Sequence, residues 1–115
     1  MAQMWKGNWK STMYPVGFAY GTVATSIDFG SGKAHIQMRY DGVFQNGISR
    51  EFDATVAADA KSAASELVSL HSVGNIQKIT FEVTQRLHDG MTGKYTSAVP
   101  ADQGVFSLVR ASASS

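Results

Sequence analysis

Residues 34–41 read Ala-His-Ile-Gln-Met-Arg-Tyr-Asp, and this stretch decides the fold class. Apolar and polar side chains alternate at every position, which is the pattern of a β-strand with one buried face. A helix would instead place its apolar residues three or four positions apart. We therefore expect a half-buried strand, and its apolar face consists of Ala34, Ile36, Met38 and Tyr40.

The same alternation continues on both sides of this stretch and is interrupted by turn residues. Gly30-Ser31-Gly32 precedes the strand, and Asn46-Gly47 follows it. Glycine and asparagine adopt left-handed conformations at little cost, so such pairs mark tight hairpin connections. The pattern predicts antiparallel strands over residues 5–13, 17–29, 34–41, 48–56, 79–84, 91–99 and 104–111.

The period changes between residues 57 and 70. This segment is rich in alanine, and helical spacing before Gly74-Asn75 is shown by Ala60, Ala63, Ala64, Leu67, Val68 and His71. It predicts one inserted α-helix over about residues 57–70. The whole chain is then a single mainly β domain, residues 1–115, built as an antiparallel up-and-down β-barrel of about seven or eight strands with that helix inserted. Closure is expected because an open sheet would expose two unpaired edges.

Composition limits the class of protein. Of the 115 residues, 43% are hydrophobic and 17% charged, which suits one packed core and excludes a disordered chain. The net charge is +1 and no basic stripe occurs, so we expect no nucleic-acid partner. Cysteine is absent, and no run reaches the roughly 18 apolar residues of a membrane span. We expect a cytoplasmic protein without a membrane partner.

Two short motifs resemble the calycin barrels, the group of lipocalins and avidins. Gly7-Asn8-Trp9 matches the Gly-x-Trp of their first strand, and Arg110 in the last strand matches their basic residue. The resemblance implies a closed barrel in which the Arg110 guanidinium stacks on Trp9 at one end. The chain departs from the biotin binders of that group, because Trp5 and Trp9 are its only tryptophans and a helix is expected mid-chain.

Several residues are candidates for a ligand site inside such a barrel. Arg50 falls in the apolar row of its strand, where a guanidinium needs an acidic partner or a bound anion. A register shift would instead bring it to the surface. Aromatic and methionine side chains on the expected inner faces would line a pocket or simply fill the core. The ligand-binding candidates are Tyr20, Met38, Tyr40, Arg50, Phe52, Phe81 and Tyr95.

Other features leave the choice of function open. Either face of residues 18–28 can point inward, and only one choice gives a polar interior. The histidines His35, His71 and His88 are scattered, and Glu51 and Asp53 suit a solvated strand face, so we expect no metal, no cofactor and no catalytic set.

The sequence thus favours a non-enzymatic binding module that holds a small apolar or amphipathic ligand in the barrel. One alternative is a protein-interaction or inhibitor module acting through the loops at 41–47 and 99–104. Another is a cofactor-free isomerase or cyclase using Asp28, Tyr20 and Tyr95. Self-association into a homo-oligomer stays open.

Overall fold

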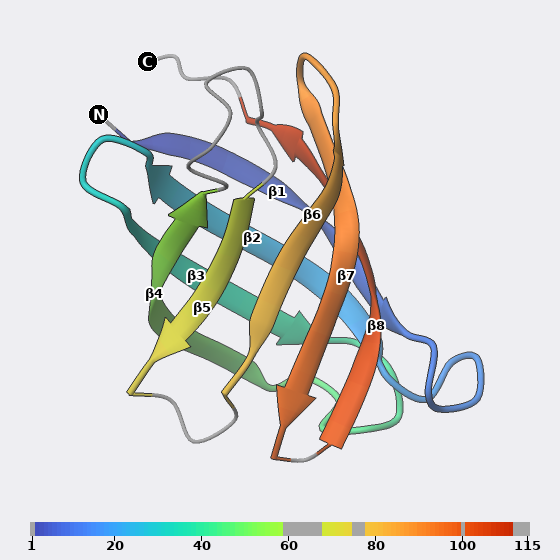
Figure 1. The fold of residues 1–115 in the computed structure, drawn as a ribbon. Helices are drawn as coiled ribbons and strands as arrows, with labels where there is room; N and C mark the ends of the chain where they lie inside the picture. The colour runs from blue at the N-terminus through green and yellow to red at the C-terminus, as the bar shows by residue number, and fades with distance from the viewer. Residues whose placement is uncertain (1, 59–67, 75–77, 100, 112–115) are drawn as a thin grey trace.

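A computed structural model describes residues 2–58, 68–74, 78–99 and 101–111, and these form eight β-strands (Figure 1). The strands follow one another along the chain as the alternation predicts, with turns or loops between them. Their bounds are β1 Gln3–Ser11, β2 Tyr20–Asp28, β3 Lys33–Tyr40, β4 Ser49–Ala58, β5 Val68–Val73, β6 Thr80–Arg86, β7 Gly90–Ala98 and β8 Ala101–Arg110.

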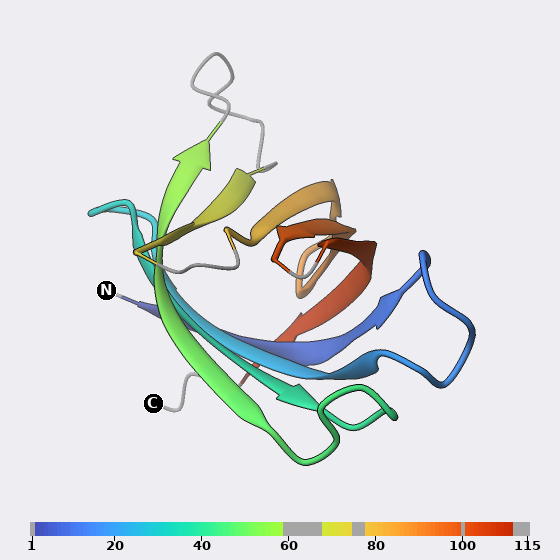
Figure 2. The same cartoon turned by 90° about the horizontal axis from the view of Figure 1, so that it is seen from below.

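The strands close into an up-and-down antiparallel barrel. Each strand pairs with the next one in sequence, and β8 returns to pair with β1, with Trp9 opposite Phe106. Figure 2 shows the strands curving around a common interior, with the connection between β1 and β2 standing away from it. The predicted closure of the barrel is confirmed. The number of strands, eight, agrees with the expected seven or eight.

The inserted helix expected over residues 57–70 is wrong at both ends. Residues 57 and 58 complete β4, and residues 68–70 begin β5, while residues 59–67 lie outside the described part of the chain. Closing the barrel needs β5 between β4 and β6, and Leu70 then buries its side chain to 3% exposure. This burial outweighs the helix preference of the neighbouring alanine-rich stretch. No helix in the described ranges is long and apolar enough to cross a membrane.

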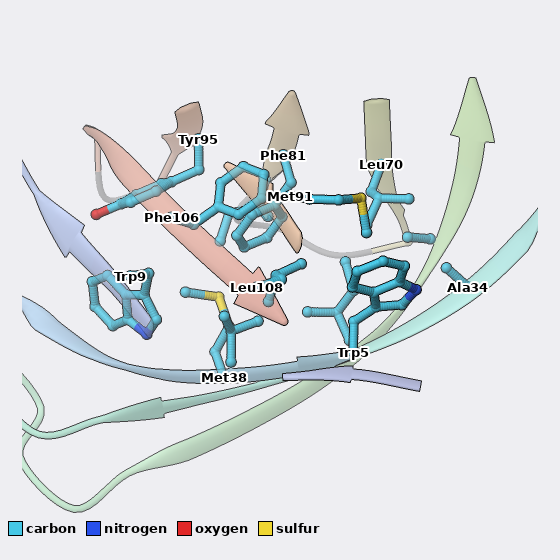
Figure 3. Close-up of a cluster of buried hydrophobic side chains, with 14 of the residues drawn as sticks. Trp5, Trp9, Ala34, Met38, Leu70, Phe81, Met91, Tyr95, Phe106 and Leu108 are labelled. Atoms are coloured by element: carbon cyan, nitrogen blue, oxygen red, sulfur yellow. The ribbon is translucent and has the colours of Figure 1, made fainter. Parts of the chain in front are cut away.

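Alternation in the sequence translates directly into burial. In β3 every second side chain is buried, as expected, and in β2 the inward set is the one that contains Val23, Thr25 and Ile27. The inner face of β2 is therefore mostly apolar, and the alternative of a polar interior is excluded for this strand. Figure 3 shows the resulting cluster, with Trp9 and Tyr95 at one end and Trp5 with Ala34 at the other.

Aromatic rings lie over glycines on neighbouring strands. The register places Trp9 opposite Gly21, Phe106 opposite Gly93 and Tyr95 opposite Gly104. A Cβ on Gly104 would overlap the Lys10 carbonyl oxygen and lie 2.6 Å from the Tyr95 ring. These glycines therefore provide the room that lets bulky rings fit inside a narrow, strongly bent barrel.

Candidate functional site

The end of the barrel around Trp5, here the Trp5 end, contains a stacked guanidinium. The Arg86 guanidinium carbon lies 5.0 Å from the centre of the Trp5 ring and 5.8 Å from that of Phe29. The pair expected from the calycin resemblance, Trp9 with Arg110, is wrong, because Arg110 is exposed and stands opposite Trp5 in the β1–β8 register. The guanidinium that covers an indole comes from β6 instead of from the last strand.

The opposite end, here the Trp9 end, is lined by aromatic rings. Trp9 packs edge-on against Tyr40 and Tyr95, with ring centres 5.0 and 5.7 Å away. These residues, with Met38 and Phe44, line a cavity of about 20 Å³. That volume is the size of about one water molecule, and its polar lining comes from the Tyr hydroxyls, Ser97 and Asp102.

Asp102 organises the polar side of this cavity. The Tyr95 hydroxyl donates to one carboxylate oxygen at 3.0 Å, and the Ser11 hydroxyl donates to the other at 2.7 Å. Burial raises the pKa of Tyr95, and the negative charge of Asp102 raises it further. The Tyr95 hydroxyl therefore stays protonated and acts as a hydrogen-bond donor, not as a base.

The sequence analysis missed Asp102 because it expected residues 100–104 to form a loop. In the structure β8 starts at Ala101, so Asp102 faces Ser97 of β7 within a β-ladder. The signal available in the sequence was the alternation that already begins there. Gln103 and Val105 take the outward positions, while Gly104 and Phe106 take the inward ones.

Arg50 lies at the rim of the Trp9 end and not deep inside the barrel. Its guanidinium carbon is 6.0 Å from the centre of the Tyr40 ring. Its Nε and Nη2 both donate to the side-chain oxygen of Gln45, at 3.1 and 2.8 Å. Gln45 has a φ of 54°, a left-handed conformation that costs a residue with a side chain about 1 kcal/mol.

Phe44, the residue before Gln45, covers the cavity. It is half-buried, and its ring centre lies 5.8 Å from that of Phe18 and 6.1 Å from that of Tyr40. Its backbone N–H donates to the Phe18 carbonyl oxygen at 2.8 Å. The connection from β3 to β4 thus places an apolar side chain over the cavity, and Gln45 is the contact between this connection and Arg50.

The structure brings some of the predicted ligand residues together and separates others. Met38, Tyr40 and Tyr95 line the cavity, with Arg50 at its rim. Phe52 and Phe81 are buried in the common core, and the Tyr20 side chain is 43% exposed on the outer wall. The sequence left open which face of residues 18–28 points inward, and the inward positions next to Tyr20 are Ala19 and Gly21.

The three residues considered for an enzyme are not brought together. Asp28 accepts the backbone N–H groups of Gly30 and Ser31 in the turn after β2. The hydrogen bond from Ser31 is the main cause that lowers the pKa of Asp28. Since Tyr20 is on the outer wall and Tyr95 is inside the Trp9 end, the three side chains share no common space.

On the outer wall, His35 bridges two carboxylates that the sequence analysis left to solvent. Its Nδ1 lies 3.0 Å from Asp53 and its Nε2 lies 2.9 Å from Glu51. Hydrogen bonds to Asp53, and then to Glu51, raise the pKa of His35. Within the described ranges, no group of three or more His, Cys, Asp or Glu side chains is arranged to hold a metal ion.

The chain matches no known protein family, and a search of curated proteins returns no match. The closed antiparallel eight-stranded barrel is compatible with a calycin-like architecture. The likeness to that group therefore depends on the barrel and on Gly7-Asn8-Trp9, since the expected pair of Trp9 with Arg110 does not form.

Proposed function

We propose that this protein is a calycin-like, non-enzymatic binding module that takes a small aromatic or apolar carboxylic acid at the Trp9 end. The observation that carries the proposal is the contact between Arg50 and Gln45. Among the described residues, the hydrogen bonds of the Arg50 guanidinium go to Gln45 alone. A ligand carboxylate would form a stronger, charge-assisted bidentate pair with the same group than a neutral amide does.

The same exchange opens space for the apolar part of the ligand. Once Arg50 binds a carboxylate, Gln45 is released from its left-handed conformation, and Phe44 moves with it because the two residues are adjacent. A ligand ring then takes the place of the Phe44 ring beside Tyr40, above Trp9 and Tyr95. This movement is needed because the cavity of about 20 Å³ is too small for an organic ligand.

Tryptophan fluorescence with phenylacetate and its neutral analogue phenylacetamide tests this function. We expect phenylacetate to change the emission and to bind at least about tenfold more tightly than the amide, because only the acid pairs with Arg50. Gln45→Ala should tighten phenylacetate binding, since no amide has to be displaced. Arg50→Gln should remove the preference for the acid over the amide.

Arg39→Gln is the matched control, because Arg39 is a neighbouring arginine on β3 whose side chain binds Asp41 on the outer wall at 3.0 Å. It should leave both affinities unchanged. Equal binding of acid and amide by the wild type, or loss of the preference in Arg39→Gln, would overturn the proposal. So would the absence of any response to phenylacetate in both the wild type and Gln45→Ala.

A further inference from the structure

The outside of the barrel carries a groove that the proposed ligand site does not use. It has a volume of about 1260 Å³ and lies along the seam where β1 meets β8. The outer faces of β2 and β7 extend it on either side, and residues of the connection between β1 and β2 line it as well. Figure 2 shows this connection standing away from the barrel wall.

One cross-strand row defines the chemistry of the groove. Tyr20, Lys10, Val105 and Lys94 are successive neighbours on β2, β1, β8 and β7. Since adjacent strands are about 4.8 Å apart, the backbones of the two lysines are about 10 Å apart, with the half-exposed Val105 between them. Neither lysine forms an ion pair with a described residue, and the part of the groove lining that the structure describes contains no Asp or Glu.

Further charged residues lie around this row. A smaller depression of about 570 Å³, which has Asn8 in common with the groove, is lined by Lys6 and by Arg39, whose charge is paired with Asp41. Glu82 stands opposite Lys94 on β6 but lies outside the lining of the groove. Among the described residues, the lining of the groove therefore carries two positive charges and no negative one.

Apolar side chains accompany the lysines. Val16 projects fully into solvent from the connection between β1 and β2, and Tyr14 lines the groove beside it. A partner that satisfies both lysines and also covers Val16 and Val105 must combine negative charge with apolar groups. An extended acidic peptide with interspersed apolar side chains has this combination.

A single-stranded nucleic acid fits less well. Such strands are held by many cations and by aromatic rings that are free to stack on bases. The described lining of the groove has two lysines and one exposed ring, Tyr20, because its Tyr14 is already packed against Phe18 at 5.2 Å with its hydroxyl bound to the Ala101 carbonyl. Because the seam strands β1 and β8 are each paired on both sides, recognition in the groove must come from side chains.

We propose that this seam groove is a docking site for an extended acidic peptide segment of a partner protein, with Lys10 and Lys94 as its anionic contacts. The groove lies on the outside of the barrel wall, whereas the proposed ligand site lies inside the Trp9 end, and Trp9 belongs to the lining of both. The two proposals are tested with different ligands and different variants, so either can fail without the other.

Fluorescence anisotropy with three fluorescein-labelled probes tests the docking site. The probes are a ten-residue peptide that alternates Asp with Val, the same peptide with Asn in place of Asp, and ten-nucleotide oligothymidine. We expect the acidic peptide to bind at least about tenfold more tightly than either of the others. The double variant Lys10→Gln, Lys94→Gln should lose this preference, and so should the wild type at high salt.

Lys33→Gln is the matched control, because it removes one exposed lysine at the start of β3, where it is paired with Asp28 in the register and lies outside the groove. It should bind the acidic peptide as the wild type does. Tighter binding of the oligonucleotide, equal binding of the two peptides, or no binding of any probe would overturn the proposal. A loss in Lys33→Gln of half that in the double variant or more would also overturn it, because the double variant removes two charges and the control removes one, so attraction would then follow total charge.

Discussion

The two ends of the barrel each contain one tryptophan of β1, and the structure holds these two side chains in different ways. Trp5 is covered by the Arg86 guanidinium, which belongs to a strand. Trp9 is surrounded by Tyr40 and Tyr95, and the cavity beside it is covered by Phe44, which belongs to a connection. Ladder pairing fixes the position of Arg86 at the Trp5 end, whereas Phe44 at the Trp9 end lies outside the strands and is held by one backbone hydrogen bond to Phe18 and by the contacts of its ring. The proposed opening is therefore assigned to the Trp9 end.

The first prediction concerns the packing of the Trp9 end. Gly104→Ala would force its Cβ into the Lys10 carbonyl and the Tyr95 ring, so we expect it to lower the free energy of unfolding by at least about 3 kcal/mol. Urea denaturation followed by tryptophan fluorescence measures this change. If the variant does not fold at all, its loss from the soluble fraction at low temperature gives the same answer.

Gly90→Ala is the matched control on β7. The nearest atom to a Cβ there is the Leu108 carbonyl oxygen at 3.6 Å, an ordinary contact, and the backbone is not left-handed. We expect its free energy of unfolding to stay within about 1 kcal/mol of the wild type. If Gly90→Ala lowered the free energy of unfolding as much as Gly104→Ala does, the packing of an aromatic ring over a glycine would not explain the sensitivity of the Trp9 end.

The second prediction tests the cover of the Trp5 end. Arg86→Met keeps much of the apolar stem but removes the charge over Trp5, so we expect a loss of about 1 kcal/mol of unfolding free energy. Arg110→Met should change it by less than about 0.5 kcal/mol, because Arg110 is exposed. Chemical denaturation of both variants makes the comparison. A larger effect of Arg110→Met would contradict the assignment of the cover over Trp5 to Arg86.

The fold followed from the sequence where burial alternates. Residues 34–41 were predicted correctly because one buried face and one solvated face leave a period of two, and a closed barrel gives every strand such a pair of faces. Residues 68–70 were wrongly predicted as helix, because β5 contributes only a short alternating segment that overlaps an alanine-rich stretch. Local preference and barrel closure conflict there, and closure is a property of the whole chain.

The candidate site was harder to predict for a related reason. Met38, Tyr40 and Tyr95 were identified because they are inward residues of long strands. Phe44 and Gln45 were missed because they lie in a connection, where no periodicity shows which side chains turn inward. The role of Arg86 was also hidden, since contact with Trp5 brings together residues 81 positions apart in the chain.

The smallest expected effect comes from His35, which links β3 to β4 from outside, beside the half of the core that contains Ala34 and the Trp5 end. Its pKa is raised in the folded state, so protonated His35 stabilises the barrel. This contribution is fully present below the unfolded pKa of about 6.5 and is lost as the pH rises through the folded pKa. We therefore expect His35→Gln to lower the urea midpoint at pH 6 and to leave it unchanged at pH 9.

Asp53→Asn separates this linkage from a packing effect. It removes the first cause of the raised pKa while the second partner, Glu51, stays in place, so an NMR titration should show the pKa of His35 move back towards its usual value. A difference between the wild type and His35→Gln that is the same at pH 6 and pH 9 would contradict the linkage. It would show that the imidazole acts by packing. The hydrogen bonds of His35 to Asp53 and Glu51 would then add no pH-dependent stability to the Trp5 end. A difference found only at low pH would show that the stability of the Trp5 end depends on pH. The cover over Trp9 would not share this dependence, because the Phe44 ring carries no charge.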